Sequence, residues 1–189
     1  MTATQEWLRS ILVVAALLGS GVAALSQLEP GFMPKGGKTL LVEIFGASPA
    51  GAELKNVLTS RRTDEEWRGA LGEGAKKLSE VEQRTLAAYL SVNMPLQPEA
   101  IERLKKPSDL EEVLPRDGRD LAWYECQSCH SLFSSHLTQD RSVQAWLNMF
   151  QSPFHRGLKM TAQEREEFAR YSALNMPMKI DDVPRDLRF

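Results

Sequence analysis

Two cysteines and a histidine lie within five residues of one another in this chain, as Cys126, Cys129 and His130. The chain contains no other cysteine. Two thiols with this spacing can form thioether bonds to the two vinyl groups of one haem, and the histidine that follows can bind its iron. The pattern C-x-x-C-H therefore predicts one covalently attached haem c, held by Cys126 and Cys129, with His130 as the proximal iron ligand.

Two other kinds of site use similar residues. In a thioredoxin-like dithiol site the two cysteines lie at the start of a helix in a βαβ unit. No strand-rich pattern precedes Cys126, which argues against such a site. A zinc site needs four ligands, usually two such pairs or one pair plus two histidines. The remaining histidines, His136 and His155, are not spaced as in a zinc finger. Haem attachment is therefore the favoured hypothesis.

The first 28 residues are predicted to be a targeting segment. Arg9 is followed by a mostly apolar stretch from Ile11 to Leu25, and Val22-Ala23-Ala24 offers a small-residue cleavage site. Such a stretch is typical of a signal peptide and is slightly short for a transmembrane helix. Because haem is attached to C-x-x-C-H outside the cytoplasm, we expect residues 1–28 to be a signal peptide or membrane anchor. The remainder is expected to be extracytoplasmic, in the periplasm.

Length and charge limit the remaining choices. The chain has 189 residues and a formal net charge of −2. Beyond the targeting segment, this length suits one ordinary domain or two small ones. The nearly neutral charge argues against nucleic acid as a partner.

The region after the targeting segment contains an internal repeat with an offset of about eighty residues. The matching pairs are 33–38 with 114–119, Trp67 with Trp146, 86–89 with 168–171, and 93–95 with 175–177. A constant offset with preserved order indicates duplicated structural units. We predict a first domain at 33–96, a linker at 97–113, a second domain at 114–180 and a C-terminal tail at 181–189.

Both repeats are predicted to be helical. Thr63 is the expected N-cap of a helix whose first turn is acidic. Ser79 and Thr161 are each followed three residues later by glutamate, which is the pattern of a capping box. Apolar residues recur at helical spacing from Val143 to Phe150. Prolines follow the two final helices and are expected to stop them. The predicted fold class is therefore all-α, with two tandem small helical domains.

The first repeat lacks the residues for a haem site. Residues 1–125 contain neither cysteine nor histidine, and the position equivalent to the haem motif falls near Ser48 to Ala52. A covalent haem in residues 33–96 is therefore excluded, and we expect a degenerate domain there, kept for packing or partner contact.

With these features, both repeats resemble small class I c-type cytochrome domains of the kind that accompany periplasmic oxidoreductases. Sulfite dehydrogenase cytochrome subunits and the haem domains of quinohaemoprotein amine dehydrogenases are similar in type. The matching marks are a Pro-x-Gly-like start, the stretch Cys126 to Leu132, the segment Thr63 to Trp67, and a capped final helix ending in tyrosine. The resemblance spans nearly all of residues 33–178 and implies two cytochrome c-like domains, of which the first departs from the family by lacking haem.

The resemblance places the sixth iron ligand between the Trp146 helix and the final helix. Met149 ranks first there, with Met160 and His155 close behind, although each could instead be a packing or surface residue. A methionine ligand would raise the reduction potential, whereas a second imidazole would lower it. We expect His136 to be exposed on the surface.

The leading functional hypothesis is an exported mono-haem cytochrome that passes single electrons between an oxidoreductase and a respiratory acceptor. Such a protein is an electron carrier rather than an enzyme, and its partner is another redox protein. Two alternatives stay open. One is a haem-bearing structural or redox subunit of a larger membrane complex, and the other is a haem sensor or catalyst with an open sixth site.

Overall fold

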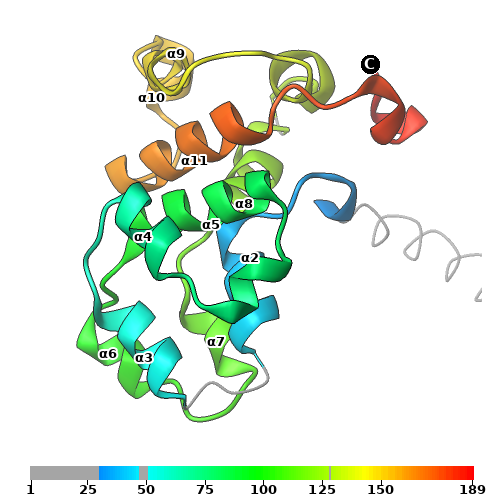
Figure 1. Cartoon of the computed structure of the whole chain (residues 1–189). Coiled ribbons are helices and arrows are strands. Elements are labelled where there is room, and N and C mark those ends of the chain that lie inside the picture. Colours follow the sequence, from blue (N-terminus) through cyan, green and yellow to red (C-terminus); the bar gives the residue numbers. More distant parts are fainter. Residues whose placement is uncertain (1–29, 47–50, 128) are drawn as a thin grey trace, which may run out of the picture. The chain divides into compact units, whose positions relative to one another are not determined.

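The computed structural model describes residues 30–46, 51–127 and 129–189 (Figure 1). From Phe32 to Phe189 the chain forms one compact unit. This unit is built from helices, and the described residues contain no strand, which confirms the predicted all-α class. The predicted signal or anchor segment lies outside the described residues. Within the described ranges, no helix is long and apolar enough to cross a membrane.

Most of the helices are short, and the two longest have 14 residues each. The first part contains η2 (Pro30–Phe32), α2 (Gly37–Phe45), α3 (Ala52–Thr59), α4 (Asp64–Ala70), η3 (Glu73–Lys77) and α5 (Glu80–Asn93). The short helices α6 (Pro98–Glu102) and α7 (Asp109–Val113) follow. The second part contains α8 (Gly118–Leu121), η4 (Ala122–Cys126), η5 (Phe133–Leu137), α9 (Val143–Met149), α10 (Pro153–Arg156), α11 (Ala162–Asn175), η6 (Ile180–Asp182) and η7 (Arg185–Leu187).

The predicted helix starts are confirmed. Thr63, Ser79 and Thr161 are the N-caps of α4, α5 and α11, and each forms a complete capping box with the glutamate three residues later. Each cap satisfies backbone N–H groups that the first turn leaves without partners, which typically stabilises a protein by about 1 kcal/mol. The helices α5 and α11 end two residues before Pro95 and Pro177, as the prolines predicted.

Helices α5 and α11 lie side by side at the centre of this unit (Figure 1). A tyrosine on each helix reaches the segment that begins the other repeat. The Tyr89 hydroxyl donates to the Pro115 carbonyl at 2.8 Å, and the Tyr171 hydroxyl donates to the Pro34 carbonyl at 2.7 Å. The two hydrogen bonds are reciprocal, so the final helix of each repeat is bonded to the first segment of the other.

Two glycines allow these tyrosines to approach the neighbouring helices. A Cβ atom added to Gly37 would lie 2.1 Å from the Cβ of Tyr89, and one added to Gly118 would lie 2.1 Å from the Cβ of Tyr171. Real Cβ atoms do not approach so closely, because the contact is far inside van der Waals distance. Both helix contacts therefore depend on the missing side chain.

Polar contacts repeat the same reciprocal arrangement where α2 meets α8. Lys38 forms an ion pair with Asp120, and Arg119 donates to the Thr39 hydroxyl at 2.7 Å. Asp117, the N-cap of α8, also accepts a hydrogen bond from the backbone N–H of Lys38 at 3.1 Å. Equivalent positions of the two repeats thus face one another.

The buried apolar residues form two clusters. The first gathers around Trp67 and the second around Trp146, and an arginine lies over each tryptophan ring at 4.9 Å and 5.0 Å. Met33, which begins the first repeat, belongs to the second cluster, whereas Leu114, which begins the second repeat, belongs to the first. The domain and linker boundaries given above stay predictions.

A buried carboxyl group lies at the α5–α11 contact. Glu167 accepts hydrogen bonds from the backbone N–H of Gly118 at 3.1 Å and from the Asn93 amide at 3.4 Å. Burial, helped by the nearby charge of Asp117, raises the pKa of Glu167 to about 8. The glutamate is therefore protonated at neutral pH, which avoids a buried unpaired charge.

Replacing Gly118 by alanine should destabilise the protein, because its methyl group would overlap Tyr171. Overpacking of this kind typically costs about 1–3 kcal/mol. The matched control is Gly69→Ala in α4, where an added Cβ meets nothing within 4 Å. This control should be neutral or stabilising by about 0.5–1 kcal/mol. Urea unfolding of the two variants would test the contact, and equal stability of Gly118→Ala and wild type would contradict it.

The raised pKa of Glu167 predicts a pH-dependent stability. Between the ordinary glutamate pKa of about 4.3 and the folded value of about 8, the folded protein holds a proton that the unfolded chain has lost. The free energy of unfolding should therefore fall as the pH rises through this range. In Glu167→Gln this fall should be smaller by up to about 5 kcal/mol, at about 1.4 kcal/mol for each pKa unit, whereas the exposed control Glu65→Gln should follow wild type. Parallel curves for wild type and Glu167→Gln would show that Glu167 does not titrate as described.

Candidate cofactor site

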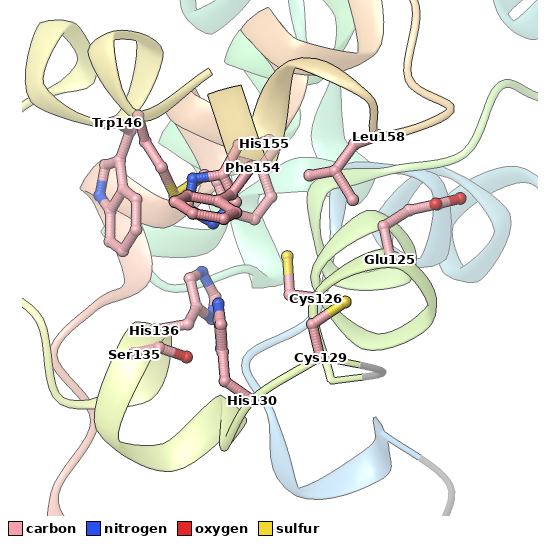
Figure 2. A pocket seen from close by; sticks show the side chains of 12 residues that line it. Glu125, Cys126, Cys129, His130, Ser135, His136, Trp146, Phe154, His155 and Leu158 are labelled. Carbon is pink, nitrogen blue, oxygen red and sulfur yellow. The ribbon is translucent and has the colours of Figure 1, made fainter. Parts of the chain in front are cut away.

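A cavity of about 320 Å³ lies between η4, η5, α9, α10 and α11. Its volume is within the range of about 300–1,000 Å³ that is usual for ligand pockets. The polar and sulfur-bearing residues that line it are Glu125, Cys126, Cys129, His130, Ser135, His136, Met149 and His155. Its apolar walls are Trp146, Phe154, Leu158 and Phe168. Figure 2 shows both cysteines and three histidines around one space.

Cys126 reaches the cavity because it is the last residue of η4, which continues α8 without a break. Asp117 caps α8, and Arg116 next to it donates to Glu125 at 2.6 Å and to Glu164 of α11 at 2.8 Å. These contacts tie the end of η4 to α11. No disulfide joins Cys126 and Cys129, and burial raises the pKa of the Cys126 thiol to about 12. The thiol is therefore protonated at neutral pH.

His130 and His155 face each other across the cavity. Their ring centroids are 6.0 Å apart and their planes are inclined by 85°. In Figure 2, His130 points into the space from one side and His155 from the opposite side. The Nδ1 atom of His155 is buried and has no hydrogen-bond partner in the described part of the chain.

The single turn α10 holds His155 in this position. The Ser152 carbonyl accepts hydrogen bonds from the backbone N–H groups of His155 at 3.1 Å and Arg156 at 2.9 Å. Arg165 of α11 donates to the carbonyls of Arg156 at 3.1 Å and Leu158 at 3.4 Å. The turn is thus fastened to the long helix directly after His155.

The two candidate methionines are placed differently. Met149, the last residue of α9, is half-buried and lines the cavity. Met160 is 6% exposed and packs in the second apolar cluster, and it does not belong to the cavity lining. The structure therefore brings His130 together with His155 and Met149, but not with Met160.

The expectation that His136 is exposed is wrong. Its side chain is buried and lies 5.2 Å, between ring centroids, from both Trp146 and Phe168. Burial lowers the pKa of His136 to about 3, so the ring is neutral. The Ser172 hydroxyl donates to the Phe168 carbonyl at 2.7 Å, so its oxygen accepts the Nε2–H of His136 at 2.8 Å. Adjacent residues on a helix do not share a face, so the apolar neighbour Leu137 gives no signal that His136 is buried.

The aromatic walls of the cavity do not follow from the sequence pattern. Helical spacing predicts that Trp146 is a core residue, but periodicity does not show what a residue faces. The structure places Trp146 and Phe168 beside the C-x-x-C-H segment.

In the described ranges, no group of three or more histidine, cysteine, aspartate or glutamate side chains is arranged to hold a metal ion. Comparison of the chain with models of protein families, with curated proteins and with solved structures found no match.

Replacing Ser172 by alanine should destabilise the protein, because both ring nitrogens of His136 would then lack partners inside the core. Leaving a buried polar group unsatisfied typically costs about 1–3 kcal/mol. Ser134→Ala, at an exposed position in η5, is the matched control and should be close to neutral. Thermal unfolding would compare the two, and equal melting temperatures would contradict the assigned hydrogen bond.

Proposed function

We propose that this protein is a mono-haem c-type cytochrome that transfers single electrons between an oxidoreductase and a respiratory acceptor. The observation that carries the proposal is the meeting of Cys126, Cys129 and His130 in one cavity with apolar walls. C-x-x-C-H is the attachment pattern of c-type haem, and here all three functional side chains of the pattern line the same space.

The residues of the cavity fit a haem by their chemistry. Haem is a largely apolar plane, and Trp146, Phe168 and Leu158 provide apolar surface beside the two thiols. The chain would have to supply iron ligands as well, and histidine, which lines the cavity as His130 and His155, is a residue type that binds haem iron.

Each side chain has a distinct part in holding the cofactor. Cys126 and Cys129 would bind the porphyrin through thioether bonds, and His130 would bind the iron. The bound haem supplies the one-electron redox chemistry, while the protein sets the potential through the axial ligands and burial. The walls Trp146 and Phe168 are buried, whereas Cys129 and Phe154 are exposed and leave the rim accessible to a partner protein.

The reciprocal contacts of α5 and α11 support the finer proposal of two tandem cytochrome c-like domains. Tyr89 and Tyr171 occupy equivalent positions, as do Gly37 and Gly118, and each pair makes the same kind of contact. In this proposal the haem-less first domain serves to pack against the second. Because c-type haem is attached outside the cytoplasm, the proposal includes an extracytoplasmic location.

Replacing both Cys126 and Cys129 by alanine should abolish covalent haem attachment. The full chain would be produced together with a c-type haem maturation system, and haem that stays with the denatured protein would be measured by its pyridine haemochrome spectrum. Gln127→Ala, an exposed change between the two cysteines, is the control and should retain one haem per chain. A wild-type protein that carries no covalent haem under these conditions would refute the proposed function.

A further inference from the structure

The facing rings of His130 and His155 have the spacing of two ligands on one metal ion. A metal–imidazole bond is about 2.0–2.1 Å long, so two imidazoles bound on opposite sides of one ion have centroids roughly 6 Å apart. The observed centroid distance is 6.0 Å. The space between the rings is therefore suited to one iron atom.

The orientation and surroundings of His155 agree with this role. The two ring planes are inclined by 85°, so the rings are nearly perpendicular, as two axial imidazoles can be. The buried Nδ1 of His155 has no hydrogen-bond partner among the described residues. This ring nitrogen is therefore available to a ligand in the cavity.

The turn that carries His155 belongs to the haem-bearing repeat. Between the equivalent residues Trp146 and Tyr171 the chain is three residues longer than between Trp67 and Tyr89. The difference falls around α10, where Arg165 fastens the turn to α11. Because this insertion is held in place by Arg165 and carries the cavity-lining residue His155, we expect it to contribute to the cofactor site.

The other candidates are less well placed. Met160 is packed in the core outside the cavity lining. His136 lies on the same side of the cavity as His130 in Figure 2, and its Nε2 is engaged by Ser172. Met149 lines the cavity but is a half-buried residue at the end of α9 that packs against the second apolar cluster.

We infer that His155 is the second axial ligand of the haem iron, so that the iron is held by two histidines. This inference rests on the proposed function and narrows it. Two imidazoles give a lower reduction potential than the histidine–methionine pair that is common in cytochromes c. The protein would therefore act as a low-potential carrier with no open iron site for a substrate or gas.

The test uses the full-length protein with its covalent haem. Oxidised wild type is expected to be low-spin and to lack the weak long-wavelength absorption band of methionine–iron coordination. Near-infrared magnetic circular dichroism should show the band position of two nitrogen ligands. Met149→Leu should leave both spectra unchanged, whereas His155→Ala should lose the low-spin spectrum and bind carbon monoxide when reduced.

His155→Met provides a variant that keeps a sixth ligand. It should remain low-spin, gain the methionine band and show a higher reduction potential than wild type. A methionine band in wild type that disappears in Met149→Leu would overturn the inference while leaving the proposed haem attachment intact. Absence of covalent haem from wild type would overturn both. The wild-type spectrum decides between the ligands even if His155→Ala does not fold.

Discussion

Two close contacts between helices, α2 with α5 and α8 with α11, fix where the other elements lie. Gly37 and Gly118 lack the side chain that would collide with Tyr89 and Tyr171. The glycine-bearing helix of each pair can therefore lie close to the backbone of the tyrosine-bearing helix. Each tyrosine hydroxyl then bonds the segment that begins the other repeat. These contacts fix the start of α8 against α11. Since η4 continues α8, the position of Cys126 follows from the same contact.

The site combines elements from one repeat, but its supports come from both. Cys126 ends η4, Cys129 and His130 follow it, and His155 lies on a turn that Arg165 fastens to α11. Helix α11 is in turn held by α5, with the protonated Glu167 between them. In the proposed two-domain arrangement, the first repeat therefore has a structural role, because α5 packs against the helix that supports the site.

Much of this arrangement could be predicted from local sequence signals. The N-cap at Thr63, the capping boxes at Ser79 and Thr161 and the prolines after the final helices were sufficient because caps and breakers act within a few residues. The C-x-x-C-H spacing is likewise a local pattern. The burial of His136 and the position of the His155 ring opposite His130 were not predicted, since they depend on contacts between segments distant in sequence. Periodicity marked Trp146 as a core residue of its helix, but not as a wall of a cavity.

The proposed function requires one haem to be bound covalently at Cys126 and Cys129. Peptide mass spectrometry of the protein, after proteolytic digestion of material produced with a haem maturation system, tests this attachment. The peptide containing both cysteines is expected to carry the added mass of one haem, and no other peptide is. Recovery of the same peptide without haem, with both thiols unmodified, would rule out covalent attachment.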